Sequence, residues 1–184
     1  VAIVTGGVAG PAAFADDLIP PPWRGEYSTT SQMWEFRTAD LIVYPDGPAA
    51  GGMPPLPSTN VVVTPGPDMD WIPADTLTGR EGIWPLSGEM DVTVDNHEPP
   101  NDFKWVWVQL TWRPQEPGTG TGPSIGDILP EPAGPPVIVE ELQLSGGWIH
   151  STWNWRIMPN PPCETFVIKG LIDVDELVID TWCI

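Results

Sequence analysis

Basic residues are scarce in this chain. Seven Lys and Arg stand against 25 Asp and Glu among 184 residues, which gives a formal net charge of −18. A field of that sign repels nucleic acids and anionic lipid headgroups, so we expect no nucleic-acid partner. The acids keep a soluble protein dispersed in water, and they also favour the binding of Ca²⁺.

Catalytic signatures are missing as well. The sequence contains neither GxSxG nor HExxH. Its opening, VAIVTGGVAG, has the look of the first strand and glycine turn of a short-chain dehydrogenase, but such a turn must open a helix onto a phosphate, and Pro11 interrupts it. Neither Tyr27 nor Tyr44 has a lysine four residues later. A glycosidase needs two carboxylates at a defined separation, but with so many acids some pair always fits, so this criterion does not identify one. We expect a protein that is not an enzyme.

Long apolar runs are also absent: no stretch of about 20 apolar residues is present to form a spanning helix. Residues 1–15 are small and apolar and end in AFA, the small-x-small form of a secretory cleavage site, although no positive charge precedes them. We expect residues 1–15 to be the loosely attached remnant of a secretion signal and residues 16–184 to form a single domain. The start at Val1 and the stop at Ile184, within an apolar run, suggest a fragment at both ends.

Cysteine is limited to Cys163 and Cys183, and no metal-ligand spacing is present. In a secreted chain, a disulfide between them is the natural expectation. It would close a loop of about 20 residues and stabilise the fold by roughly 3 kcal/mol. Two unpaired thiols are the alternative.

Helical periodicity does not appear over any useful length, whereas short alternating segments recur between clusters of proline (25 residues) and glycine (19 residues). This pattern predicts an all-β fold, an antiparallel β-sandwich of eight or nine strands with a jelly-roll arrangement. The predicted strands span 30–36, 40–44, 60–64, 88–95, 103–112, 137–144, 148–157, 164–169 and 171–182.

Tryptophan is abundant: most of the eleven indoles sit in two alternating runs, 103–112 and 148–157. Side chains alternate across a strand, so one face of each run is predicted to belong to the core. The core positions are Val106, Val108, Leu110 and Trp112 in the first run and Ile149, Ser151, Trp153, Trp155 and Ile157 in the second.

The opposite faces of the two runs mix indoles with polar groups. A pyranose presents an apolar C–H face to an indole and hydroxyls to amide, imidazole and guanidinium groups. If the two strands are neighbours, these faces predict a carbohydrate-binding surface; alternatively, Trp105 and Trp107 pack beneath the long loop 113–136. The candidate ligand-binding residues are Trp105, Trp107, Gln109, Trp148, His150, Asn154 and Arg156.

The last strand, LIDVDELVIDTWCI, is acidic. Alternation puts Asp173 and Asp175 on one face and Glu176 and Asp180 on the other. Hard cations prefer several oxygen ligands from separate segments, so Asp173 and Asp175 are candidate ligands of a structural Ca²⁺. No other cofactor is expected.

Several segments carry a family resemblance: FADDLIPPPWRG, STTSQMWEF, GIWPLSGEMDVTV, WVQLTWRPQ, GGWIHSTWNWRI, NPPCETFVIKG and VDELVIDTWCI. From about residue 14 onward, the chain resembles uncharacterised secreted bacterial proteins of the PEP-CTERM-sorted type, which are associated with exopolysaccharide. The resemblance implies export, a cell-surface or matrix location, and membrane contact only through a sorting tail that this sequence does not contain. It carries over no functional residue.

Two functions follow from these observations. The first is a secreted, non-enzymatic structural protein of the extracellular matrix or cell surface, with matrix proteins as partners. The second is a carbohydrate-binding module that uses the exposed tryptophan face to bind extracellular polysaccharide.

Overall fold

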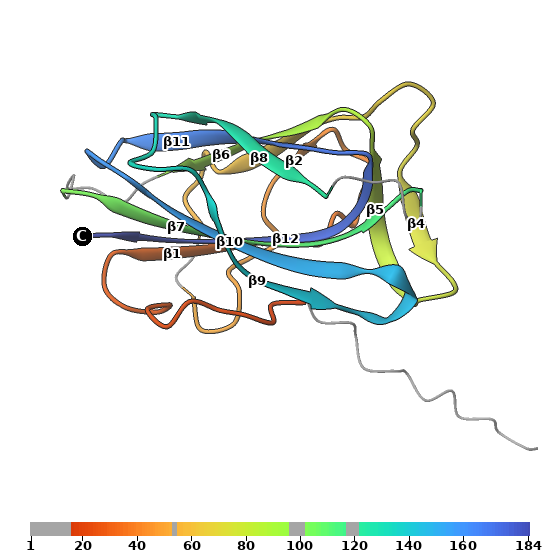
Figure 1. Ribbon diagram of the computed structural model, residues 1–184, viewed down its shortest axis with the longest axis horizontal. Coiled ribbons are helices and arrows are strands. Elements are labelled where there is room, and N and C mark those ends of the chain that lie inside the picture. Colours follow the sequence, from red (N-terminus) through yellow and green to blue (C-terminus); the bar gives the residue numbers. More distant parts are fainter. Residues whose placement is uncertain (1–15, 53–54, 96–101, 117–121) are drawn as a thin grey trace, which may run out of the picture.

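The computed structural model describes residues 16–52, 55–95, 102–116 and 122–184, which fold as a β-sandwich (Figure 1). The expected secretion signal, residues 1–15, lies outside the described residues. The strands are β1 Thr29–Trp34, β2 Ile42–Val43, β3 Asn60–Thr64, β4 Ile72–Asp75, β5 Arg80–Leu86, β6 Glu89–Asp95, β7 Lys104–Pro114, β8 Ser124–Leu129, β9 Val137–Gln143, β10 Ile149–Ile157, β11 Cys163–Lys169 and β12 Ile172–Cys183.

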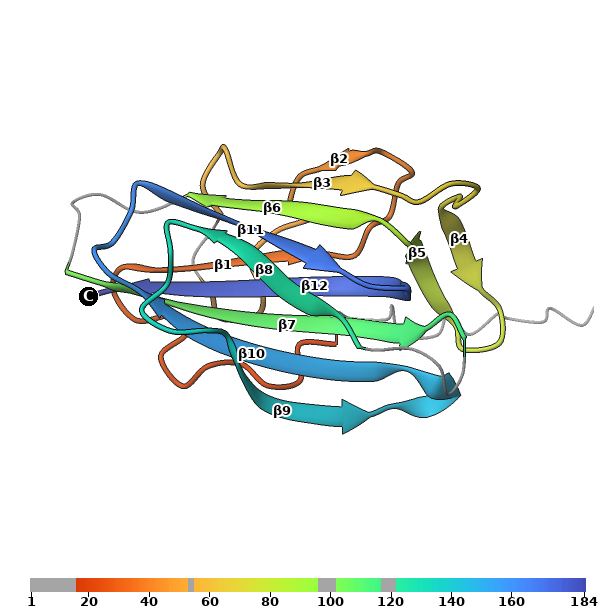
Figure 2. The same ribbon diagram turned by 45° about the horizontal axis from the view of Figure 1, so that its top comes forward.

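Two antiparallel sheets face each other (Figure 2). The large sheet has seven strands in the order β4-β5-β12-β7-β10-β9, and β1 pairs with the second half of β12. The small sheet has five strands in the order β2-β3-β6-β11-β8. From β5 to β12, consecutive strands alternate between the two sheets. The one exception is the step from β9 to β10, which are neighbours in the large sheet. This winding corresponds to a jelly roll and confirms the expected fold class.

The nine predicted strands all form, with ends shifted by a few residues, and three further strands, β4, β5 and β8, were not predicted. They were missed because of their prolines. Pro73 and Pro85 lie inside β4 and β5, and β8 lies between proline-rich segments. Proline is rare within strands because it cannot donate a ladder hydrogen bond. Among the described residues, the one helical element is a 3₁₀ turn, Ser145–Gly147, so the expectation of no longer helix is confirmed there.

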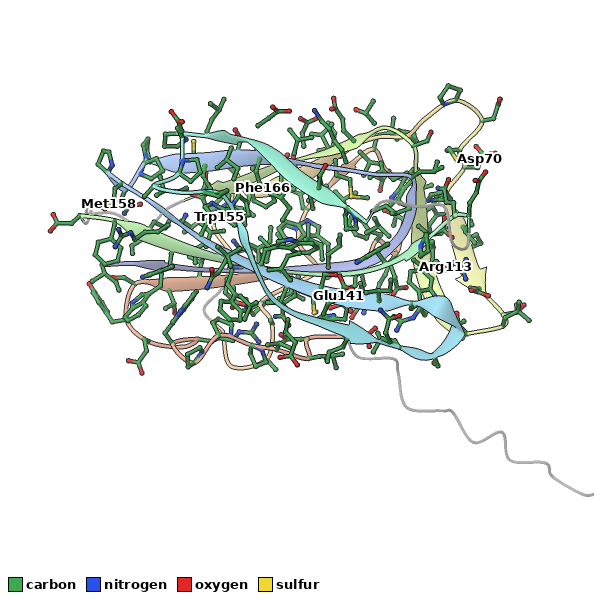
Figure 3. All side chains as sticks on the ribbon, viewed as in Figure 1. Asp70, Arg113, Glu141, Trp155, Met158 and Phe166 are labelled. Atoms are coloured by element: carbon green, nitrogen blue, oxygen red, sulfur yellow. The ribbon has the colours of Figure 1, made fainter. Side chains whose placement is uncertain are left out.

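The core lies between the sheets and contains the predicted aliphatic faces. Val106, Val108 and Leu110 of β7 are fully buried. Trp155 of β10 meets Phe166 of β11 edge to face, with ring centroids 5.2 Å apart, so this pair joins the two sheets (Figure 3). Aromatic pairs in this geometry are worth about 0.5–1.5 kcal/mol beyond the burial of their area.

The expected disulfide is absent, which corrects the prediction. Both cysteines are thiols, and Cys163 is exposed whereas Cys183 is buried. Their side chains lie on different sides of the small sheet: Cys163 alternates with the inward-facing Glu164 and Phe166, and so points to solvent. Cys183 is the last residue of β12 in the large sheet. It lies four residues after the inward-facing Ile179, an even number, and so points to the same face. The disulfide was predicted from the positions of the two cysteines along the sequence, which do not show the face of the sheet on which each thiol lies.

A buried ion pair spans the sandwich. Lys104 Nζ of β7 lies 2.5 Å from Glu164 Oε2 of β11, and neither side chain is exposed. Burial raises the pKa of Glu164, and the charge of Lys104 opposes that rise. Because an unpaired buried charge costs several kcal/mol, this pair fixes how the two sheets face each other at that end.

Candidate functional site

The candidate site lies on the outer face of the large sheet, meaning the side turned away from the small sheet. The strands β7 and β10 are antiparallel neighbours, as the sugar-surface hypothesis required. Trp107 lies opposite Asn154, and Trp105 lies opposite Arg156. On the other side of β7, β12 places Trp182 opposite Trp105. The outer face therefore brings indoles and polar groups side by side.

A segment that we name the strap, residues 16–24, crosses this outer face. In Figure 1 it is the red stretch on the side of the large sheet away from β8 and β11. The backbone N–H of Ile19 donates to Gln109 Oε1 at 2.8 Å, and Trp107 Nε1 donates to the carbonyl of Ile19 at 2.9 Å. Gln109 Nε2 also donates to Asp17 Oδ1 at 2.7 Å. The strap therefore uses the polar groups of the sheet as its own hydrogen-bond partners.

Arg24 fastens the far end of the strap. Its Nε donates to Asp180 Oδ1 at 2.7 Å, and its Nη2 donates to Asp17 Oδ1 at 2.9 Å. Asp180 is fully buried, and burial raises its pKa while the hydrogen bond from Arg24 opposes the rise. Charge-assisted, forked pairs of this kind are among the stronger polar contacts in proteins.

His150 is held as a neutral imidazole beneath the strap. Its Nδ1 lies 3.0 Å from Thr111 Oγ1, and its Nε2 lies 3.2 Å from Gln109 Oε1. Because Gln109 Oε1 is a pure acceptor, His150 Nε2 carries the proton and Nδ1 accepts from the threonine hydroxyl. Burial lowers the pKa of His150 to about 4. With both ring nitrogens engaged, His150 has no free position for a ligand.

Two arginines lie over the ring of Trp148. The guanidinium carbons of Arg80 and Arg113 lie 5.0 Å and 4.7 Å from its ring centroid. Arg113 also donates to Asp173 and Asp75, at the end of the sandwich where β4 and β5 lie (Figure 3). Trp148 is fully buried, so this indole belongs to the packed structure.

For three of the seven predicted ligand-binding residues, the prediction of an exposed position is therefore wrong. Alternation identifies the face of a strand correctly, but it does not reveal that the strap and two arginines cover part of that face. The buried residues are Gln109, Trp148 and His150. The residues that keep exposed surface are Trp105, Trp107, Asn154 and Arg156.

The alternative interpretation, in which Trp105 and Trp107 pack beneath loop 113–136, is also wrong. Residues Ser124–Leu129 of that loop form β8, which pairs with β11 in the small sheet. Both indoles lie on the outer face of the large sheet, and the strap reaches Trp107 instead.

The exposed part of the site is a line of half-buried aromatic side chains, which we name the aromatic row: Trp23, Trp182, Trp105 and Phe103. Trp23 comes from the strap and stacks on Trp182, with ring centroids 5.7 Å apart and planes 27° from parallel. The exposed Arg156 lies 5.9 Å from the Trp105 ring and 5.4 Å from the Phe103 ring. Alternation along β12 would have identified Trp182, whereas no sequence signal places Trp23.

A group of carboxylates lies where the strap begins. Asp16, Asp175 and Glu176 each offer an oxygen within 4.8 Å of the other two. A β-bulge between Val174 and Glu176 interrupts the alternation of β12, which explains how adjacent acids converge. Burial raises the pKa of Glu176 to about 9 and that of Asp175 to about 6.

The predicted calcium pair of Asp173 and Asp175 is thereby corrected. Asp173 Oδ2 accepts from Arg113 Nε at 2.9 Å and lies opposite Arg113 in the sheet. Asp175 instead joins Asp16 and Glu176. The strict alternation assumed from the sequence fails at the bulge.

Comparison with known proteins gives no relative: no family model, curated protein or solved structure matches this chain significantly. Within the described residues, the structure contains no helix of the length and apolar character needed to cross a membrane.

Proposed function

We propose that this protein is a secreted, non-enzymatic component of the bacterial cell surface or extracellular matrix, and that it binds polysaccharide through the aromatic row. The observation that carries the proposal is the continuous line of half-buried indoles from Trp23 through Trp182 to Trp105, flanked by Arg156. Export and the PEP-CTERM resemblance rest on the sequence alone.

The chemistry of the row suits a sugar ring. Indoles held on a sheet are flat and rigid, so stacking a pyranose on them costs little conformational entropy. The Arg156 guanidinium and the Asn154 amide lie on the neighbouring strand and can donate to sugar hydroxyls. Both side chains keep exposed surface, in contrast to the buried Gln109 and His150.

The charge of the protein restricts the ligand class. A net charge of −18 repels polysaccharides rich in uronic acids or sulfates. We therefore propose neutral polysaccharides, in which equatorial hydroxyls leave an apolar C–H face, as the preferred partners.

A glycan array carrying neutral and acidic polysaccharides tests this proposal. We expect the wild type to be retained on neutral glycans and Arg156→Ala to bind at least about tenfold more weakly, because a charged hydrogen-bond donor is worth about 1.5–3 kcal/mol. Arg37→Ala is the matched control, since Arg37 is an exposed arginine that pairs with Glu35. It follows the Trp34 end of β1, whereas Thr29 at the other end of that strand lies opposite Trp182 of the row. Retention on no neutral glycan, or equal loss in both variants, would contradict the proposal.

A second candidate function, structural contact between copies of the chain, is favoured by β9. This strand is the edge of the large sheet and exposes three adjacent aliphatic side chains, Val137 (57%), Ile138 (59%) and Val139 (43%). Exposed apolar edge strands invite pairing with another strand. An antiparallel pairing of two copies centred on Ile138 would set Val137 against Val139 and keep Glu140 away from its equivalent. The bulge at Val139 shortens the regular edge, so we expect weak association.

Sedimentation at rising salt distinguishes this candidate, because salt screens the repulsion between two acidic copies. We expect dimers of the wild type at about 0.5 M NaCl, and only monomers of Ile138→Lys. Leu77→Lys is the control, as Leu77 is 93% exposed and lies in the β4–β5 turn. A monomeric wild type at every salt concentration would rule out contact through β9.

A further inference from the structure

The carboxylates of Asp16, Asp175 and Glu176, which we name the carboxylate cluster, have a charge that their protein partners do not balance. Arg80 forms ion pairs with both Asp16 and Asp175. Among the described residues, those are the ion pairs of the cluster, so one positive charge faces three acids.

Glu176 supplies a second and independent observation. Its side chain is almost completely buried, with 4% of the residue exposed. Its Oε2 accepts a hydrogen bond from the backbone N–H of Asp16. Its Oε1 is buried and has no hydrogen-bond partner among the described residues. A buried carboxylate oxygen without a partner costs free energy, and an ion at the cluster would remove that cost.

We propose that the carboxylate cluster binds Ca²⁺, which bridges the strap to β12. The ligand set consists of oxygen alone, which suits a hard cation and not zinc or copper. Oxygens bound to Ca²⁺ at about 2.3–2.6 Å can lie up to roughly 5 Å apart across the ion. The cluster, with its oxygens within 4.8 Å of one another, fits that limit. Mg²⁺ requires about 2.0–2.1 Å and stricter geometry.

Such an ion would act on the strap as well as on the sheet. Asp16 begins the described strap, whereas Asp175 and Glu176 belong to β12. Water completes the coordination shell, as is common for Ca²⁺ in proteins. Binding at the cluster would therefore hold Asp16 to Asp175 and Glu176 of β12, whereas Arg24 ties the strap to Asp180, farther along the same strand.

Calorimetric titration of the EDTA-treated protein with CaCl₂, at physiological ionic strength, tests the proposal. We expect one site with a Kd of about 10⁻⁴–10⁻³ M, typical of extracellular modules. Saturating Ca²⁺ should raise Tm by roughly 3–10 °C. MgCl₂ at the same concentration should raise it much less.

Two variants and a control make the test specific. Glu176→Gln and Asp16→Asn should each weaken Ca²⁺ binding at least about tenfold, since each removes a charged ligand. Asp16 lies in the strap, so its variant keeps the sheet intact if Glu176→Gln fails to fold. Glu140→Gln, on the exposed face of β9, should bind as the wild type does. A wild type that binds no Ca²⁺, or Asp16→Asn and Glu140→Gln proteins with equal affinity, would overturn the proposal.

Discussion

The tryptophans of this protein differ in role according to the residues that surround them. Trp153 and Trp155 face the small sheet and are buried in the core, whereas Trp105 and Trp107 face outward and are half-buried. Trp148 also lies outside the core cluster but is fully buried, in contact with two arginines. Whether a single indole supports stability or meets a ligand is therefore decided by its neighbours and not by its type.

Replacement of Trp155 by Ala should lower the free energy of unfolding by about 3–5 kcal/mol, because it leaves a cavity beside Phe166. Urea denaturation measures this loss directly. A loss below about 1 kcal/mol would mean that the two sheets are not packed through this pair.

His150 should make stability depend on pH. Its pKa is about 4 in the folded protein against an ordinary value of 6.5, mainly because it is buried. Between these values the unfolded state binds a proton that the folded state does not, so stability falls as the pH drops from 6.5 toward 4. The full effect is about 3 kcal/mol. Asp16 and Asp17 of the strap oppose the shift, and Arg80 of β5 adds to it.

His150→Gln removes this titration and should flatten the curve. The comparison between the two proteins isolates His150, because Glu176 and Asp175, whose raised pKa values stabilise the fold on acidification, are common to both. Denaturation midpoints at several pH values between 6.5 and 4 measure the difference. Parallel curves for the wild type and His150→Gln would show that the imidazole is not buried in the neutral form.

Among the secondary-structure elements, alternation predicted the strands and their faces well. The faces of 103–112 and 148–157 came out as expected because a buried face must be apolar in a sandwich. The strap has no periodic signal: its attachment depends on backbone groups of Ile19 and on single pairs such as Arg24 with Asp180. The bulge in β12 and the prolines of β4 and β5 also follow from local backbone geometry that hydrophobic patterning does not encode.

The strap should depend on Arg24. Arg24→Met leaves Asp180 buried without its charged partner, which should cost about 3–5 kcal/mol. The double variant Arg24→Met/Asp180→Leu should recover most of that loss, because no buried charge then remains. Thermal or urea denaturation of both variants measures the loss and its recovery. Equal losses in the single and double variants would show that the clamp contributes nothing beyond packing.

At the scale of the whole molecule, the outer face of the large sheet has one region covered by the strap and one region that keeps exposed surface. The strap, the Arg24 clamp and the carboxylate cluster cover the middle and one end, while the aromatic row remains at the other end. The strongly acidic character of the chain, −18 overall, acts on the molecule as a unit by selecting against acidic partners. Function is thus expected at the end where apolar surface and donors remain accessible.

The most direct test of this account measures Trp105→Ala in two ways on the same protein, by Tm and by Kd for a neutral glycan retained by the wild type. We expect Tm to change by less than about 3 °C, since the indole is half-buried on the outer face, while the affinity falls by at least about tenfold, which is 1.4 kcal/mol. Tyr44→Ala, which removes an exposed aromatic ring beside β2 of the small sheet, should change neither quantity. A large fall in Tm with unchanged glycan affinity would contradict the account, because Trp105 would then be a packing residue and the aromatic row would not be a binding surface.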